Sequence, residues 1–342
     1  YNYYQNINEK ILSENLNSLI DAKNSSDGNP LFGEKLVFQI DDGYQTAVGD
    51  WLSIDKNKFP NGLSEITAKA RENDIKTGIW LAPFCAEKKS ELAKKHPEWI
   101  SCDENGNPIL CGNNWGGFYA LDIYNPEVQN YIRKVCRTLI DEWGFSLLKI
   151  DFLYAACFVP HKNKTSGQVM HDELSFFREA SSGAELLGCG VPLGSAFGLV
   201  DYCRIGADVS LSWNDKLYMR LCHRERPSTK NTILNSLYRR QLDGRAFLND
   251  PDVFLLRTEN ENLGLERKTL LSKINALSGS LLFTSDNPNN YDSTQNEILK
   301  EVLKLRSAEI TSVTNEKNYV TVKYVLDGTD NSIQFNLKNG KR

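Results

Sequence analysis

Charged side chains stand at the ends of several apolar stretches of this 342-residue chain, and their types could do chemistry. They are Asp41, Asp42, Lys149, Asp151, Arg204, Asp208, Asp250 and Asp252. Buried charges are rare in proteins unless they are paired or functional. Each of these acids could instead cap the helix that follows it, but the strand-end position recurs too often for capping alone.

The stretch 147–154 carries the most informative pair, because Lys149 and Asp151 lie two residues apart in an apolar run. Strand geometry sends residues i and i+2 to the same face, so we expect the cation and the carboxylate to point together. In a (β/α) barrel the carboxyl end of a strand is the place where chemistry is expected. A purely structural ion pair is the alternative interpretation of this stretch.

Three tryptophans, Trp51, Trp80 and Trp115, accompany the acids. Carboxylates accept hydrogen bonds from hydroxyl groups, and aromatic faces stack on the apolar faces of sugar rings. Without a metal or phosphate motif, this combination favours sugar binding. Two carboxylates on either side of a glycosidic bond would hydrolyse it, and a separation of ~5–5.5 Å would indicate a covalent, retaining mechanism.

The elements that position these residues alternate between strand and helix, which predicts right-handed βαβ units around a parallel sheet. The periodicity predicts strands at 36–41, 77–83, 147–153, 186–189, 202–206, 246–250 and 281–285. A TIM barrel needs eight strands, and the missing first strand would precede the helix predicted over 8–23, before residue 1. We therefore expect an α/β TIM (β/α)8 barrel, with an open seven-stranded sheet as the alternative.

The C-terminal part changes pattern after a helix predicted over 294–307. Residues 318–337 alternate in polarity around Asp327-Gly328, which predicts a β-hairpin. We expect a barrel domain over 1–308, and over 309–342 the start of a small antiparallel domain like a β-sandwich. The stretch 101–117 is rich in Asn and Gly and is predicted as a loop.

Composition excludes several classes of function. The net charge of −4 gives no basic face for nucleic acid or anionic membranes, and no apolar run approaches the ~20 residues that span a bilayer. The eight cysteines form no C-x-x-C pair and the four histidines are isolated, so we expect neither a metal nor a cofactor. Reduced thiols in a cytoplasmic protein are the preferred interpretation.

An ordered series of motifs resembles that of the glycoside hydrolase family 36 α-galactosidases (melibiases), from about residue 1 to about residue 286. The motifs are Gln39-Ile40-Asp41-Asp42-Gly43-Tyr44, Gly49-Asp50-Trp51, Gly78-Ile79-Trp80-Leu81-Ala82-Pro83-Phe84, His96-Pro97-Glu98-Trp99, Lys149-Ile150-Asp151-Phe152-Leu153, Gly188-Cys189-Gly190-Val191-Pro192-Leu193, Arg204-Ile205-Gly206-Ala207-Asp208 and Leu248-Asn249-Asp250-Pro251-Asp252. Any one motif would be weak evidence, whereas the ordered series is highly specific.

The resemblance implies a retaining α-galactosidase in which Asp151 matches the nucleophile and Asp208 the general acid/base. Lys149 would keep Asp151 ionised. Asp208 must hold a proton before it can donate one. Burial and the charge of Asp151 would favour the protonated form, whereas Arg204 would oppose it, and the residues alone do not rank these effects.

The resemblance also implies substrate contacts. Asp41 and Asp42 would bind O4 and O6 of galactose, and Trp80 would wall the pocket. Lys149 and Arg204 would hold O2, O3 and the catalytic carboxylates, and Cys189 would lie near C2. Asp50, Trp51 and Trp115 are assigned to substrate binding as well. The expected partner is a galactose-containing oligosaccharide, and a homo-oligomer of the full-length protein is left open.

Two alternatives to an α-galactosidase stay open. One is an α-N-acetylgalactosaminidase of the same family, for which the loop 189–195 must make room at C2. Gly190 and Gly194 leave that question open, whereas Cys189 favours galactose. The other is a non-hydrolytic carbohydrate-binding fragment, because the family's first-strand tryptophan and its large upstream β-sandwich would both lie before Tyr1.

Overall fold

A computed structural model describes residues 4–24, 35–158, 161, 163–221 and 226–342. Its contacts divide the chain into two compact units. The N-terminal unit comprises Tyr3–Ile20 and Phe32–Cys203, and the C-terminal unit comprises Tyr1–Asn2, Asp21–Leu31 and Arg204–Arg342. The predicted domains 1–308 and 309–342 stay a prediction.

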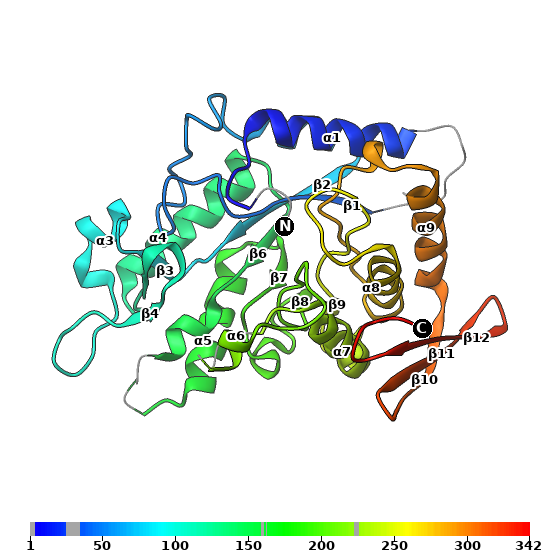
Figure 1. Ribbon diagram of the computed structural model, residues 1–342. Coiled ribbons are helices and arrows are strands. Elements are labelled where there is room, and N and C mark those ends of the chain that lie inside the picture. The colour runs from blue at the N-terminus through cyan, green and yellow to red at the C-terminus, as the bar shows by residue number, and fades with distance from the viewer. Residues whose placement is uncertain (1–3, 25–34, 159–160, 162, 222–225) are drawn as a thin grey trace. The chain divides into compact units, whose positions relative to one another are not determined.

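The N-terminal unit is built on parallel strands that follow one another through helices (Figure 1). All four residues of β6 and six of the seven in β2 are buried, as expected for parallel strands that are covered on both faces. Across the sheet the strands run in the order β1 (Leu36–Ile40), β2 (Ile75–Leu81), β6 (Leu147–Ile150), β7 (Glu185–Gly188) and β8 (Tyr202–Arg204).

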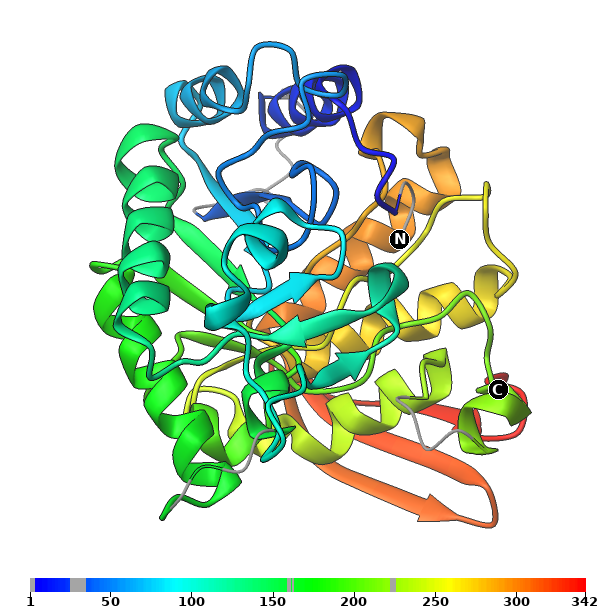
Figure 2. The ribbon, with the colours of Figure 1, turned by 90° about the vertical axis from the view of Figure 1, so that its left-hand side faces the viewer.

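Helices precede the inner strands of this sheet, as the βαβ pattern predicts. Asn125 caps α4 by accepting a hydrogen bond from the Glu127 N–H, and Thr165 and Gln168 form a capping box at the start of α5. Figure 2 shows α4 and α5, both green, side by side along one margin of the unit. The helices are α1 (Glu9–Asn24), α2 (Ser64–Glu72), α3 (Glu91–Lys95), α4 (Pro126–Arg137, continued by a π-helical turn over Thr138–Glu142) and α5 (Ser166–Ala180).

A small antiparallel sheet follows β2 in the same unit. Its order is β3 (Cys85–Glu87), β5 (Phe118–Ala120) and β4 (Leu110–Gly112). The prediction of a loop over 101–117 is therefore wrong for β4. Strands of three residues give too short a polarity alternation to be read from sequence.

The C-terminal unit packs helices and an antiparallel sheet around its own apolar core (Figure 1). The core contains Trp213 and Phe335, whose rings meet edge to face with centroids 6.4 Å apart. Its elements are β9 (Leu248–Asp250), α6 (Leu217–Leu221), α7 (Thr229–Arg239), α8 (Leu265–Ser278), α9 (Ser293–Lys304), β10 (Glu309–Glu316), β11 (Tyr319–Leu326) and β12 (Thr329–Asn336).

Two strand predictions in this unit have different outcomes. The hairpin around Asp327-Gly328 is confirmed as β11 and β12, and β10 adds a strand that the sequence analysis missed. The predicted strand 281–285 is wrong, because this stretch makes one isolated parallel bridge, between Thr284 and Phe254.

Two further observations concern composition. Among the helices that the structure describes, none is both long enough and apolar enough to cross a membrane. The seven cysteines in the described ranges are all free thiols, and Cys222 lies outside those ranges.

Replacing Phe335 by Ala should lower the free energy of unfolding by about 3–5 kcal/mol, because it removes a fully buried ring from the C-terminal core. Urea unfolding measures this difference. Tyr319→Ala on β11 is the control, since Tyr319 is 39% exposed, and it should cost less than about 1 kcal/mol. Equal losses in both variants would contradict the assignment of this core.

Candidate active site

One row of side chains crosses the carboxyl ends of β1, β2 and β6. The strand registers pair Ile40 with Ile79, and Trp80 with Lys149. Asp41 follows Ile40, so Asp41, Trp80 and Lys149 occupy one row. Neighbouring strands lie about 4.8 Å apart, and the long Lys149 side chain spans β2 to donate from Nζ to Asp41 Oδ2 at 2.7 Å. The structure thus joins two residues that the sequence placed 108 positions apart.

The electrostatics of this pair favour the ionised forms. The Lys149 side chain is 10% exposed and the Asp41 side chain 55%. Enclosure by neighbouring protein groups raises the pKa of Asp41, but the charge and hydrogen bond of Lys149 and the Asp42 N–H outweigh it and lower the pKa to about 2. Asp41 is therefore a carboxylate at neutral pH, able to accept hydrogen bonds from hydroxyl groups.

Asp151 lies directly after β6, and both of its carboxylate oxygens accept hydrogen bonds. Oδ1 accepts from the Phe152 N–H at 2.7 Å, and Oδ2 accepts from the Trp80 indole N–H at 3.1 Å. Phe152 has φ +55°, an uncommon conformation for a bulky residue that often marks functional sites. The strand β6 ends at Ile150, so the predicted strand end at 153 is wrong.

The loop after β7 closes against Asp151. The buried Cys189 donates its backbone N–H to Ile150 O at 2.8 Å, which carries the chain past the end of β6. Gly190 follows with φ +55°, and a Cβ on it would lie 2.7 Å from Asp151 Oδ1 and 2.9 Å from Phe152 N. Only glycine fits this contact, both for the backbone conformation and for the lack of space.

The three tryptophans form a chain of ring contacts that ends at Phe152. Ring centroids lie 5.8 Å apart for Trp51 and Trp80, 6.1 Å for Trp80 and Trp115, and 4.7 Å for Trp115 and Phe152. Trp51 is fully buried and packs against Trp80, and its predicted contact with substrate stays a prediction. Trp115 is partly exposed and can offer a face to a ligand.

Asp42 is held by three side-chain donors. Gln45 Nε2 donates to Oδ1 at 2.6 Å, and Oδ2 accepts from Gln5 Nε2 at 2.6 Å and from the Trp115 indole N–H at 3.0 Å. The sequence analysis missed both glutamines. Gln45 lies only three residues after Asp42, so its contact with Asp42 could have been predicted from the local sequence. Gln5 is distant in sequence, and no local pattern indicates its contact.

Asp50 has a structural position in this unit. Its two carboxylate oxygens accept hydrogen bonds from the backbone N–H groups of Glu91 and Leu92, both at 2.9 Å. It therefore binds the N-terminus of α3, where a negative charge is favoured. This geometry fits a helix cap, and the substrate contact that we predicted for Asp50 stays a prediction.

In the C-terminal unit Arg204 is shared among three carboxylates. Its Nε donates to Asp250 at 3.0 Å, Nη1 to Asp208 at 3.1 Å, and Nη2 pairs with Asp252 at 2.9 Å. Asp250 and Asp252 are fully buried, whereas the Asp208 side chain is 51% exposed. The structure therefore does not bury Asp208 as predicted.

Asp252 is the acid of this cluster with the most perturbed titration. Burial raises its pKa first, the Arg204 charge lowers it, and the charges of Asp208 and Asp250 raise it again, to about 6. Asp252 also adopts φ +80°. Asp250 and Asp252 were predicted to lie among the strand-end acids of the barrel rim, but no specific role was predicted for either.

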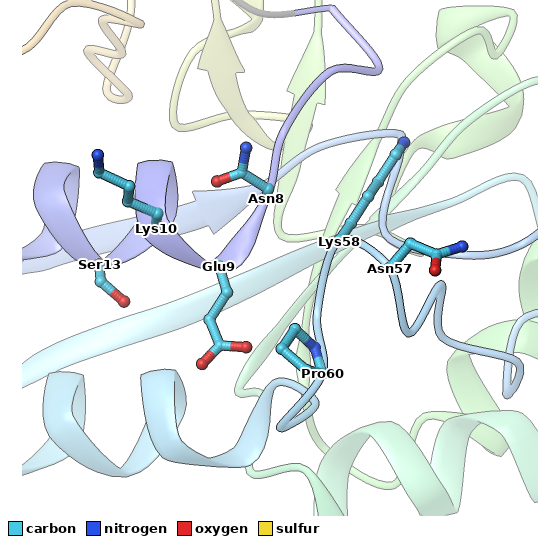
Figure 3. Close-up of a pocket in the computed structure, with 7 residues that line it drawn as sticks. All are labelled: Asn8, Glu9, Lys10, Ser13, Asn57, Lys58 and Pro60. Atoms are coloured by element: carbon cyan, nitrogen blue, oxygen red, sulfur yellow. The ribbon is translucent and has the colours of Figure 1, made fainter.

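A surface hollow of about 490 Å³ lies beside the start of α1 (Figure 3). It is lined by Asn8, Glu9, Lys10, Ser13, Asn57, Lys58 and Pro60. Lys58 Nζ donates to the carbonyl oxygens of Gln5 and Gly43. The hollow contains none of the predicted site residues. Over the described residues, no group of three or more His, Cys, Asp or Glu side chains could hold a metal ion.

These positions can be compared with known proteins. Residues 12–172 match the Melibiase family model. The Melibiase match includes Asp41, Asp42, Trp80, Lys149 and Asp151, and therefore the whole row across β1, β2 and β6.

Curated relatives match between about a third and two fifths of the chain. The A type blood α-D-galactosamine galactosaminidase of Flavonifractor plautii is 30% identical over 138 residues, 37% of this chain and 13% of that protein. An α-galactosidase of Escherichia coli is 32% identical over 123 residues, 33% of this chain and 16% of that protein. The chain therefore spans less than a fifth of the curated relatives that it matches.

A solved relative covers nearly the whole chain. TtGalA, an α-galactosidase from Thermus thermophilus in complex with stachyose, is 32% identical with a TM-score of 0.78 and covers 89% of this chain and 63% of its own. Its complex with p-nitrophenyl α-D-galactopyranoside gives 30% identity and a TM-score of 0.80, covering 96% and 64%. This likeness confirms the predicted TIM-barrel fold class.

Replacing Lys149 by Met should raise the pKa of Asp41 from about 2 to above its ordinary value of 3.8, because enclosure then acts unopposed by the cation. Carboxyl ¹³C NMR titration of Asp41 measures this. Lys76→Met is the control, since it breaks a second ion pair of 2.7 Å, between Lys76 and Glu185, whose lysine is 41% exposed. A pKa that stays near 2 in Lys149→Met would contradict the assigned cause.

Proposed function

We propose that this chain is the catalytic part of a retaining glycoside hydrolase of family 36 that releases terminal α-linked galactose from oligosaccharides. The observation that carries the proposal is the constellation at the ends of β2 and β6. There Trp80 fixes the Asp151 carboxylate beside the Lys149–Asp41 pair. The Melibiase match and the likeness to the Thermus α-galactosidase support it, and the motif series favours family 36.

In the proposed reaction Asp151 attacks the anomeric carbon, and the bond from this carbon to the leaving oxygen breaks. Asp208 gives its proton to that oxygen, and the galactosyl ester of Asp151 forms. Asp208, now a carboxylate, then takes a proton from a water molecule, and the oxygen of that water attacks the anomeric carbon. This step releases the Asp151 carboxylate and leaves Asp208 protonated again. The separation of ~5–5.5 Å that this mechanism requires between the two carboxyl groups stays a prediction.

The local contacts suit these roles. The hydrogen bonds from Phe152 N–H and Trp80 Nε1 favour the charged form of Asp151, which is the nucleophilic one. Asp41 and Asp42 present carboxylate oxygens beside it that can accept hydrogen bonds from sugar hydroxyls. We also propose that Cys189 lies near C2 and that Trp115 offers a face to the ring.

An α-N-acetylgalactosaminidase remains the second candidate, because the Flavonifractor relative carries a galactosaminidase name. The buried Cys189 beside Gly190 favours galactose, which needs less room at C2. A carbohydrate-binding fragment without turnover is the third. We also propose a cytoplasmic location, which the free thiols of the described cysteines support.

The chain should hydrolyse an aryl α-galactoside, but neither the aryl α-N-acetylgalactosaminide nor the α-glucoside. Asp151→Asn should lower kcat by at least about 10³-fold, because the nucleophile is lost, while galactose still binds. Steady-state kinetics and calorimetry measure the two quantities. Turnover of the galactosaminide instead would establish the second candidate. Absence of turnover by this chain and by a chain extended upstream would refute hydrolysis.

Trp80→Phe should lower kcat by about tenfold or more, because it removes one hydrogen bond to a charged group. It should also move the acidic limb of the pH–rate profile to higher pH, since Asp151 would then protonate more readily. Trp51→Phe makes the same change to a buried indole whose N–H has no hydrogen-bond partner in the structure, so it should leave the acidic limb in place. Equal profiles for the two variants would count against the assigned role of Trp80.

A further inference from the structure

The position of Arg204 poses a problem for the acid role of Asp208. Its guanidinium donates to Asp208 at 3.1 Å, and a cation this close favours the carboxylate over the acid. A general acid must hold its proton until the leaving oxygen takes it. An unshared arginine would therefore oppose the first step of the proposed reaction.

Two buried acids on the other side of Arg204 change this balance. Asp250 accepts from Nε, and Asp252 pairs with Nη2. Neither acid is exposed to solvent, so their interactions with Arg204 are little screened. When both acids are ionised, which for Asp252 requires a pH above about 6, one positive charge faces two buried negative charges. Asp208 then lies beside a group whose summed charge is negative.

Asp252 is also tied to the backbone next to Asp208. Its Oδ2 accepts from the Val209 N–H at 2.7 Å, so a residue on the β9 side fixes the chain just after the acid. From α8, Asn275 donates to the Asp252 carbonyl, and from α7, Arg239 donates to the Ile205 carbonyl. Among the described residues, the charged groups that act on Asp252 include Arg204, Asp208 and Asp250.

We propose that Asp252, together with Asp250, is a positioning residue that counters the charge of Arg204 and so lets Asp208 hold its proton. This inference rests on the proposed function, because it assigns Asp208 as the general acid. Arg204 can then stay in contact with Asp208 and orient it without driving Asp208 to its ionised form. The negative charge of Asp250 and Asp252 favours the protonated form of Asp208, which the exposure of its side chain to solvent does not.

The titration of Asp252 supports this coupling. Its pKa is raised to about 6 by burial first, and the charge of Asp208 is among the further causes. Interaction between two titrating groups is mutual, so an ionised Asp252 must in turn favour the protonated form of Asp208. The two carboxyl groups therefore interact through one shared guanidinium.

Asp252→Asn removes one negative charge at nearly constant volume and tests the proposal. The basic limb of the pH profile of kcat/KM, where Asp208 loses its proton, should move to lower pH by roughly half a unit to one unit. Carboxyl ¹³C NMR should show Asp208 titrating at lower pH in the variant, a readout that needs no turnover. Asp250→Asn should shift both in the same direction, and it serves if Asp252→Asn does not fold.

Asp286→Asn is the matched control. Asp286 is a buried acid of the same unit that pairs with Arg257 at 3.0 Å and accepts backbone N–H groups, as Asp252 does. Its variant should lose stability but leave the basic limb in place. An unchanged basic limb and an unchanged Asp208 titration in Asp252→Asn would overturn the proposal. A wild-type chain without turnover, but with the shifted Asp208 titration, would instead count against the proposed function alone.

Discussion

The ion pair between Lys149 and Asp41 is the interaction on which the arrangement of the N-terminal site depends. It spans β2, so it can form only when β1, β2 and β6 keep the register that places Trp80 between the two charges. A slip of one residue in any of these strands would turn its side chain to the other face of the sheet. The pair therefore links the folding of the sheet to the position of the Trp80 indole and, through it, of Asp151.

The C-terminal unit also holds its acids with a buried cation, but this cation is an arginine and not a lysine. Lys149 is a point charge on a flexible stem, whereas Arg204 presents a planar fork whose three nitrogens each meet a different carboxylate. A lysine could not hold Asp208, Asp250 and Asp252 in fixed directions at once. The planar fork of arginine therefore suits the C-terminal unit, where three acids share one cation.

Much of this arrangement could be predicted from local pattern. The apolar runs around Leu36 and Leu147 set β1 and β6, and the acids that follow them stand at the strand ends as expected. Other features depend on contacts between residues distant in sequence. Three features arise only when distant segments meet. They are the sharing of Arg204 among three acids, the exposure of Asp208, and the hydrogen bond from Gln5 to Asp42. The positive φ of Phe152 could not be predicted from the residue type, since phenylalanine favours a strand.

Gly190 gives the proposed nucleophile a property that concerns entropy rather than charge. With Gly190 packed on one side, Phe152 N–H on one oxygen and Trp80 on the other, the Asp151 carboxylate has little freedom to rotate. The entropy of fixing this group is therefore lost once, when the chain folds, and not again in each turnover. A substrate that enters the proposed pocket meets an oxygen already aimed at it, so its own binding energy need not be used to align the attack.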